Sequence, residues 1–262
     1  MPKKQDSFNY NYLWVFLLVL IVIILLWSCS CKEPYKVTSL TQISESDNIH
    51  IISAIIGGID QHTEFNHPNY HFFSDSSLFP RMDLTPRLRA KYFKMCGHQL
   101  YPTATALIWI DGNMEIKNPK FIEWMVTLMG DADCAFFKHN ARNNVQEELD
   151  YCVDNMSDPY IKARYGNEPM ITQVQDYVKQ GYNPRSGGLV CCGLFIRKTT
   201  EKVNQAFDHW FIENVKWSIQ DQLSFPYIAW KYNLNVKEIP NDKHQSIFES
   251  DYHRLGGHMK VQ

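Results

Sequence analysis

The stretch IWIDGNMEIKNP, residues 108–119, ends an apolar run with an acidic residue, a glycine and an amide residue. Because residues two apart in an extended chain project to the same side, the Asp111 carboxylate and the Asn113 amide can face one ligand. Oxygen donors of this kind suit Mn²⁺ or Mg²⁺. The same residues also form ordinary turns, since glycine tolerates positive φ and Asp or Asn side chains bond their own backbone. The stretch therefore indicates either a divalent-metal site or a plain turn.

Residues that can hold a nucleotide follow two earlier apolar runs. Gly57 lets the backbone approach a nucleotide closely, although a double glycine is also typical of a tight turn. The Asp75 carboxylate can hold a ribose or a base. Arg89, Lys91 and Lys94 can meet a diphosphate, although a run of charges on a helix is usually a solvated face. These residues are candidates for donor binding.

A further polar group lies in the string FFKHNARNNVQEE. Arg142 and Glu147 or Glu148 can make a plain ion pair at roughly helical spacing. Alternatively, His139 and Arg142 line the pocket of the donor or of the acceptor. The residue types alone favour neither interpretation.

Alternating strands and helices are predicted to position these residues. Apolar, β-branched runs predict strands at residues 49–56, 70–74, 104–110, 135–137 and 188–196. Helical patterns fill residues 86–96, 121–129, 199–214 and 220–230. This order predicts an α/β domain with a mostly parallel, Rossmann-like central sheet and flanking helices. Ligands of such domains bind beyond the carboxyl ends of the strands.

The composition is that of an ordinary globular body, with 45% hydrophobic residues, 21% charged residues and a formal net charge of −2. The near balance of charge gives no electrostatic reason to expect nucleic acid as a partner. The length of 262 residues fits one fairly large domain plus an appendage, and we expect the domain to cover residues 48–262.

The appendage contains an uncharged apolar run, LWVFLLVLIVIILLW. With its flanking residues it approaches the roughly 17 to 20 residues that cross a bilayer as a helix. We therefore expect a cytoplasmic tail at residues 1–11, an anchor in the lipid bilayer at residues 12–31 and a short stem at residues 32–47. The lysines before the run favour a cytoplasmic N-terminus, which makes the chain a single-pass type II membrane protein with a non-cytoplasmic body. A cleaved signal peptide is the alternative.

The seven cysteines form no C-x-x-C metal motif. If the body lies outside the cytosol, a disulfide among Cys96, Cys134 and Cys152 is possible. Its connectivity does not follow from the sequence.

Seven short strings occur in a characteristic order across residues 49–240: IISAIIGGID, FFSD, RLRAKYFK, LIWIDGNMEI, FFKHNARNNVQEE, GLVCCGLFIRK and IQDQLSFPYIAW. In this order they resemble a glycosyltransferase-like family first catalogued as a domain of unknown function, which includes plant Golgi proteins linked to pectin and mucilage synthesis. The resemblance implies a GT-A fold, a nucleotide-sugar donor that is UDP-linked by analogy, and a glycan acceptor. It also implies a type II anchor, in a Golgi-like compartment if the source is eukaryotic.

The resemblance implies a metal site at the opening stretch. Asp111 matches the first position of the Asp-x-Asp motif of GT-A enzymes, and Asn113 replaces the second aspartate. A Mn²⁺ or Mg²⁺ ion there lowers the barrier, because negative charge develops on the departing phosphates. His258 and Lys260 resemble the C-terminal segment that completes such a metal site and grips the diphosphate. A solvated chain end is the alternative.

Asp221 and Gln222 resemble the Asp-Gln pair that opens a helix beneath the sugar in retaining GT-A enzymes, and they are our candidate catalytic pair. Asp221 would orient hydroxyls of the sugar or the acceptor, or act as a base if the enzyme inverts. An acid near a helix N-terminus is also simply a good capping residue. The stereochemical course is left open.

The expected function is therefore that of a membrane-anchored, hexosyltransferase-like glycosyltransferase acting on a glycan or glycoconjugate. One alternative is a lipid-amide hydrolase, since one plant branch of the family carries a ceramidase label. The sequence nevertheless resembles neither a Ser-His-Asp triad nor a metallohydrolase histidine cluster. A second alternative is a non-catalytic glycan-binding protein that keeps the fold but has lost the metal through Asn113.

Overall fold

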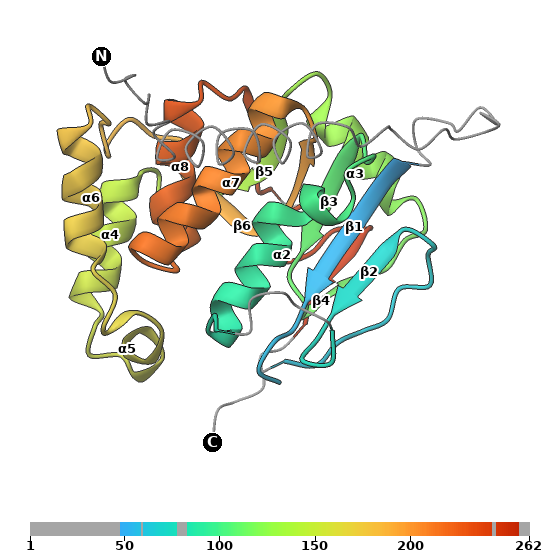
Figure 1. Ribbon diagram of the computed structural model, residues 1–262, viewed down its shortest axis with the longest axis horizontal. Helices are drawn as coiled ribbons and strands as arrows, with labels where there is room; N and C mark the ends of the chain where they lie inside the picture. Colours follow the sequence, from blue (N-terminus) through green and yellow to red (C-terminus); the bar gives the residue numbers. More distant parts are fainter. Residues whose placement is uncertain (1–47, 59, 78–82, 243–244, 257–262) are drawn as a thin grey trace, which may run out of the picture. The chain divides into compact units, whose positions relative to one another are not determined.

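A six-stranded sheet in the order β2-β1-β3-β6-β5-β7 forms the centre of the described chain (Figure 1). The computed structural model describes residues 48–58, 60–77, 83–242 and 245–256. The strands of this sheet are β1 (Ile49–Ala54), β2 (Tyr70–Phe73), β3 (Ala106–Ile110), β5 (Cys134–Lys138), β6 (Val190–Lys198) and β7 (Val236–Ile239). A separate two-stranded sheet pairs β4 (Met114–Ile116) with β8 (His253–Leu255).

The central sheet is mostly parallel, as predicted. Strand β1 runs parallel to β2 and β3, and β5 runs parallel to β7. Only β6 is reversed within the described sheet, since it pairs antiparallel with both β3 and β5. The carboxyl ends of β1, β2 and β3 therefore meet at one edge, which is where ligands bind in sheets of this kind.

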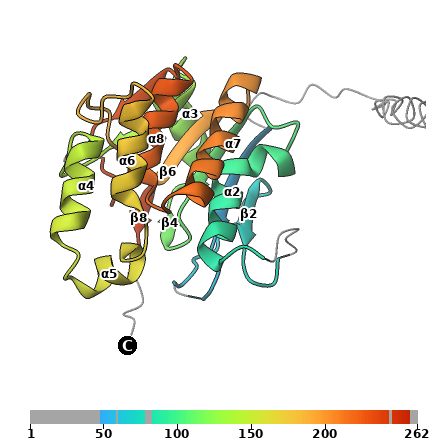
Figure 2. The same ribbon diagram turned by 60° about the vertical axis from the view of Figure 1, so that its left-hand side comes forward.

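Helices cover both faces of the sheet. They are α2 (Pro86–Leu100), α3 (Phe121–Met129), α4 (Val145–Asp154), α5 (Pro159–Tyr165), α6 (Met170–Lys179), α7 (Glu201–Lys216) and α8 (Asp221–Lys231). In Figures 1 and 2, α2, α7 and α8 lie on one face and α3 lies on the other. Helices α4 and α6 pack against α8. The first residue of α8, the predicted catalytic aspartate, is thus supported from several sides.

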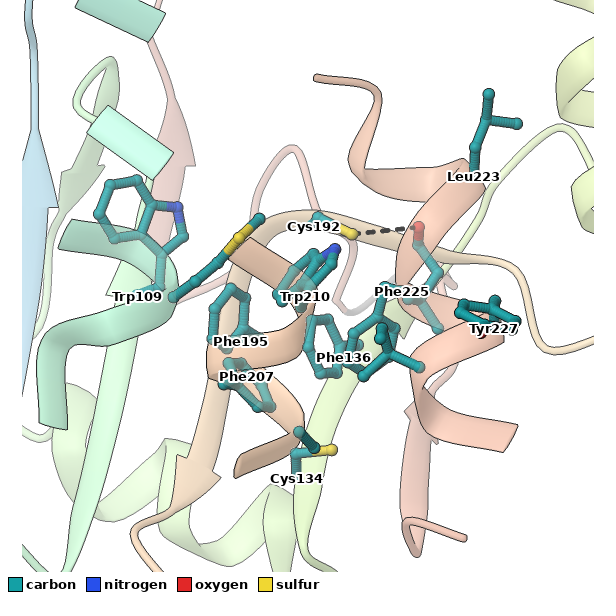
Figure 3. Close-up of a cluster of buried hydrophobic side chains, with 14 of the residues drawn as sticks. Trp109, Cys134, Phe136, Cys192, Phe195, Phe207, Trp210, Leu223, Phe225 and Tyr227 are labelled. Atoms are coloured by element: carbon teal, nitrogen blue, oxygen red, sulfur yellow. Dashed lines mark hydrogen bonds between the residues drawn. The ribbon is translucent and has the colours of Figure 1, made fainter. Parts of the chain in front are cut away.

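The alternation of side chains along the strands divides the core into two clusters. In β3, Leu107 and Trp109 belong to the cluster beneath α2, α7 and α8, whereas Ile108 and Ile110 belong to the cluster beneath α3. Figure 3 shows the first cluster, in which aromatic side chains of the strands meet those of α7 and α8. All five residues of β3 are buried, so this strand holds a fixed position between the two layers.

Gly112 keeps the end of β3 close to the end of β1. A Cβ atom at this position would lie 2.2 Å from Ile55 Cγ1 and 2.8 Å from the Ala54 oxygen. Only glycine fits such a close approach. The turn that begins at Asp111 therefore lies directly beside the segment that leads to Gly57.

The predicted elements are present, with some ends shifted. The helix predicted at residues 86–96 continues to Leu100 through a kink at Cys96. The strand predicted at residues 188–196 is β6, which begins at Val190 and ends at Lys198. The sequence patterns gave no expectation for α4, α5, α6, β4, β7 and β8.

The disulfide that the sequence allowed among Cys96, Cys134 and Cys152 does not form: all three are free and buried. They lie on different elements, α2, β5 and α4. Burial raises the pKa of the Cys134 and Cys152 thiols to about 12, so these side chains stay protonated and pack as small apolar groups.

The predicted cytoplasmic tail, anchor and stem, residues 1–47, lie outside the described residues. Across the ranges that are described, no helix combines the length and apolar character needed to span a membrane.

Candidate active site

Three of the predicted donor-binding residues meet at the carboxyl ends of β1 and β2. The Gly57 amide donates a hydrogen bond of 2.9 Å to Asp75 Oδ2, and the Arg89 guanidinium lies 3.7 Å from Asp75 Oδ1. Gly57 has a φ of 92°, which favours glycine. The Asp75 side chain remains 54% exposed, so this carboxylate can still reach a ligand. The structure thus places these three predicted residues together; their role in donor binding stays a prediction.

A buried charged cluster, Lys91, Lys94 and Asp221, joins α2 to the start of α8. The Lys91 and Lys94 ammonium groups lie 2.5 Å and 2.6 Å from the same carboxylate oxygen, Asp221 Oδ2. The Lys94 and Asp221 side chains are only 5% and 6% exposed. The other carboxylate oxygen, Asp221 Oδ1, is buried and has no hydrogen-bond partner within the described chain. The solvated-face interpretation is therefore wrong for both lysines.

The protonation states of this cluster follow from its geometry. Burial favours the neutral form of Asp221, but Lys91 and Lys94 outweigh it and hold the Asp221 pKa below its ordinary value. Burial likewise opposes the charge of Lys94, but Asp221 and Asp111 raise the Lys94 pKa above its ordinary value. For Lys91, burial and the charge of Lys94 prevail over Asp221, so its pKa is lowered. An acid with a lowered pKa is a weak base, which favours orientation over proton abstraction for Asp221.

Asp111 lies at the end of β3, beside this cluster. Its Oδ1 accepts a hydrogen bond of 2.7 Å from Trp109 Nε1 and lies 3.8 Å from the Lys94 ammonium. The Met114 amide donates to the Asp111 carbonyl oxygen at 2.9 Å, so the backbone forms the plain turn that the sequence allowed. The Asp111 side chain is nevertheless 44% exposed and can serve a ligand.

The described C-terminal segment also reaches this turn. Strand β8 pairs antiparallel with β4. Beyond β8, the Gly256 amide donates a hydrogen bond of 2.6 Å to the backbone carbonyl oxygen of Asn113, which is buried. The chain thus arrives beside Asp111 two residues before His258. His258 and Lys260 themselves lie outside the described residues.

The donors at this turn fit a divalent cation in one respect. Gly193 leaves the second oxygen of Asp111 clear, because a Cβ atom at position 193 would lie 3.0 Å from Asp111 Oδ2. Over the described ranges, no group of three His, Cys, Asp or Glu side chains could hold a metal ion. A cation bound here would need ligands of other types, such as Asn113, or residues outside those ranges, such as His258.

The other predicted residues belong to a second buried cluster, here called the Glu148 network. Glu148 Oε2 is bonded to Arg142 Nε, and Glu148 Oε1 accepts a hydrogen bond of 2.7 Å from Gln220 Nε2. Tyr165 Oη donates to Gln220 Oε1 at 3.0 Å, and His139 Nε2 lies 3.9 Å from Glu148 Oε2. The predicted ion pair of Arg142 with a glutamate is present, but Arg142 precedes α4, so the spacing is not helical. The network ends at Gln220, immediately before the Asp221-Gln222 pair.

The sequence did not identify several residues that bond to the predicted site residues. The indole of Trp109 could have been found, since it lies two residues before Asp111 on the same side of a strand. Gln220 and Tyr165 carried no signal, because their partners lie 72 and 55 positions away in the chain.

The chain is similar to one protein family and to several solved structures. A family model described as "TOD1/MUCI70, glycosyltransferase-like domain" matches residues 83–253, which include Asp111 and Asp221. No curated protein matches the chain.

Solved structures of glycosyltransferases are similar at low identity. A glycosyltransferase involved in glycosylation of the major capsid of PBCV-1 is 12% identical, with 75% of this chain and 83% of that chain covered and a TM-score of 0.35. Mouse xyloside xylosyltransferase 1, apo form, is 10% identical over 73% of this chain and 84% of that chain, with a TM-score of 0.38. The WbbM bifunctional glycosyltransferase, apo structure, is 10% identical over 78% of this chain and 40% of that chain, with a TM-score of 0.39.

Proposed function

Because the chain belongs to the TOD1/MUCI70 glycosyltransferase-like family, we propose that it transfers a sugar from a nucleotide-sugar donor, UDP-linked, to a glycan or glycoconjugate acceptor. The family match confirms the resemblance stated from the sequence and the expectation of a glycosyltransferase-like enzyme. The observation that best supports the proposed reaction is the cluster of Lys91, Lys94 and Asp221 at the ligand-binding edge of the sheet.

The reaction chemistry gives each part of this edge a role. Gly57, Asp75 and Arg89 hold the nucleoside end of the donor, where glycine allows close backbone approach. Lys91 and Lys94 supply fixed positive charge where the departing diphosphate becomes more negative. Such prearranged charge is worth more in a buried site than in water.

Asp221 and Gln222 act on the transferred sugar in this proposal. Asp221 is held ionised by its two lysines, and its unpartnered Oδ1 is free to accept a hydrogen bond from a sugar hydroxyl. Gln222 follows it in the first turn of α8 and is half-buried. In this arrangement His139 and Arg142 do not contact the donor. They act on the site indirectly, because Glu148 links them to Gln220, which precedes Asp221.

We also propose a GT-A arrangement for this domain and a bound Mn²⁺ or Mg²⁺ ion. The mostly parallel sheet with the single reversed strand β6 supports the first proposal. The half-exposed Asp111, beside the space that Gly193 leaves, supports the second, with Asn113 and His258 as further ligands. When bound, the ion would neutralise negative charge on the diphosphate, and the positive charge of Lys260 would neutralise more of it.

We further propose that residues 12–31 anchor the enzyme in a bilayer as a type II protein with a non-cytoplasmic catalytic body, in a Golgi-like membrane if the source is eukaryotic. The uncharged run within this segment and the lysines before it support this topology.

A donor screen tests the proposed reaction. The full chain in detergent is incubated with a panel of UDP-sugars, with Mn²⁺, Mg²⁺ or a chelator, and released UDP is measured. We expect one donor to give metal-stimulated UDP release, and Asp111→Ala to reduce it at least about 100-fold, because the diphosphate loses its anchoring carboxylate. Asp131→Ala, at an exposed aspartate away from the edge, is the matched control and should keep full activity.

The screen also separates the alternatives. A lipid-amide hydrolase would release fatty acid from ceramide and no UDP from any donor. If Asp111→Ala released UDP at the wild-type rate, Asp111 would have no part in the reaction. Equal rates with chelator and with metal would remove the cation from the proposal.

A further inference from the structure

A cavity of about 510 Å³ opens beside the charged cluster. Its volume falls within the range of about 300–1,000 Å³ that small-molecule sites occupy. The residues that matter for its chemistry are Gly57, Arg87, Glu168, Asn214, Trp217 and Ile219. They come from the end of β1, the start of α2, the segment before α6, and the end of α7 with the connection to α8.

The cavity lies on the path between the donor edge and the catalytic pair. Gly57 belongs both to the cavity and to the contact with Asp75. Ile219, two residues before Asp221, also lines the cavity, and its amide donates a hydrogen bond of 3.3 Å to Glu168 Oε2. Glu168 is close enough to Lys91 for their charges to interact. A molecule in this cavity therefore lies next to the cluster where the sugar is transferred.

Two residues that line the cavity each carry a buried polar atom with no partner in the described chain. Asn214 is 2% exposed, and its Nδ2 is bound to the Trp210 carbonyl oxygen at 3.1 Å and to Ser224 Oγ at 3.2 Å. These bonds fix the amide, yet its Oδ1 is buried and unpartnered, as is Trp217 Nε1. An unpartnered buried polar group costs on the order of 1–3 kcal/mol, so a ligand that enters the cavity and reaches these atoms would recover that cost.

The lining is suited to a sugar ring. An aromatic ring such as Trp217 offers an apolar surface together with an N–H donor, which matches a ring that has C–H groups on its face and hydroxyls at its edge. Asn214 Oδ1 and the Glu168 carboxylate accept hydrogen bonds from hydroxyls, and Arg87 donates them. Glu168 would repel a diphosphate, whereas it bonds readily to neutral hydroxyls.

We propose that this cavity is the acceptor subsite and that it binds a glycan through the ring of Trp217 and through hydrogen bonds that glycan hydroxyls donate to Glu168 and Asn214. This inference rests on the proposed glycosyltransferase activity and adds to it the place and the chemical class of the acceptor. The sugar in the cavity presents a hydroxyl toward the Asp221 end of the site.

Direct binding tests the subsite without requiring turnover. The full chain in detergent is applied to a printed panel of oligosaccharides of two to six sugars. Wild type should bind at least one glycan, and Trp217→Ala and Glu168→Gln should each weaken that binding about tenfold. Trp230→Ala, at a tryptophan that is 47% exposed on α8, is the matched control and should bind like wild type. Binding to no glycan, or equal binding by all variants, overturns the proposal.

A kinetic comparison distinguishes this subsite from the donor half. With the donor found in the UDP-sugar screen and a glycan found on the panel, Trp217→Ala should raise the KM for the acceptor about tenfold and shift the KM for the donor less than twofold. A shift of the donor KM as large as that of the acceptor KM assigns the cavity to the donor and overturns the proposal. If no UDP-sugar releases UDP while Trp217→Ala still weakens glycan binding about tenfold, the glycan subsite stands and the proposed transferase activity fails.

Discussion

Two buried ionic clusters lie on either side of the start of α8, and they differ in how completely their carboxylates are bonded. In the Glu148 network, Arg142 takes one oxygen and Gln220 takes the other. In the charged cluster, two lysines converge on Asp221 Oδ2, and Asp221 Oδ1 has no partner in the described chain. One carboxylate is saturated, and the other keeps an open bonding position.

This difference indicates that the Glu148 network supports the fold, whereas the charged cluster takes part in the reaction. Burying charges is costly, and a buried pair is kept without penalty only where its remaining atoms are also bonded. The Glu148 network meets this condition and so stabilises the position of Gln220. The charged cluster does not: both ammonium groups lie on Asp221 Oδ2, and the unpaired Oδ1 is a bonding position that a substrate can complete.

The two lysines of the charged cluster provide the sharpest test. They touch the same oxygen from the same helix, but burial lowers the pKa of Lys91, whereas Asp221 and Asp111 raise the pKa of Lys94. Since a lowered pKa means that folding disfavours the charge, Lys91→Met should leave the free energy of unfolding unchanged or raise it. Lys94→Met should lower it by about 3 kcal/mol, because it removes the favourably paired cation. Both should reduce UDP release about 100-fold.

Urea denaturation and UDP release measure the two effects separately. Lys202→Met is the matched control, because Lys202 also pairs with an aspartate, Asp133, at 2.6 Å but lies 49% exposed and away from the site. It should change the unfolding free energy by about 1 kcal/mol or less. Equal destabilisation by Lys91→Met and Lys94→Met with UDP release at the wild-type rate would mean that the cluster serves the fold alone.

The Glu148 network should show the opposite balance between stability and activity. Glu148→Gln removes the buried charge that holds Arg142, so we expect the free energy of unfolding to fall by about 3 kcal/mol. Activity should fall only about tenfold, because the change loosens Gln220 and the start of α8 but removes no group that contacts the substrate. Glu147→Gln is the control on the same helix, since Glu147 bonds Asn143 and Asn144 in a capping box at the start of α4. A fall in activity of 100-fold or more with unchanged stability would assign Glu148 to the chemistry.

The sequence predicted the parts of the site that depend on strand ends. Gly57, Asp75 and Asp111 each follow an apolar run, and the parallel order of β1, β2 and β3 brings those ends together. Lys91 and Lys94 share a helix face by their spacing, so their convergence could be expected, although their burial could not. Whether a charged helix face meets solvent or another helix depends on packing partners that are distant in the sequence.

The remaining parts depended on long-range contacts. Helices α4 and α6 mix polar residues with short apolar repeats, and both pack against α8, which is far along the chain. The bond from Lys94 to Asp221 spans 127 positions, and that from Gln220 to Glu148 spans 72. No local pattern encodes such pairs, because each partner alone resembles an ordinary surface residue.

The pH dependence of stability gives the smallest effect and separates the two clusters once more. His139 Nδ1 accepts the amides of Ala141 and Arg142 at 3.2 Å and 3.0 Å, so the folded network holds a neutral ring. Burial lowers the pKa of His139, with Glu148 opposing and Arg142 adding to the shift. The unfolded chain then binds more protons than the folded chain below about pH 6.5, and stability should fall as the pH drops from 7 to 5.

The charged cluster should not contribute to this slope. The Asp221 pKa is held below its ordinary value of 3.8, so its contribution is present above that value and is lost only as the pH falls further. Denaturation at pH 7, 6 and 5 should therefore give a shallower slope for His139→Asn than for wild type, and the wild-type slope for Lys91→Met. Burial lowers the pKa values of His253 and His71 to about 4, so these residues also add to the slope, because their unfolded forms take up protons between pH 7 and 5. The test is therefore the difference in slope between the variants and wild type. Identical slopes for His139→Asn and wild type would show that the Glu148 network does not depend on a neutral His139.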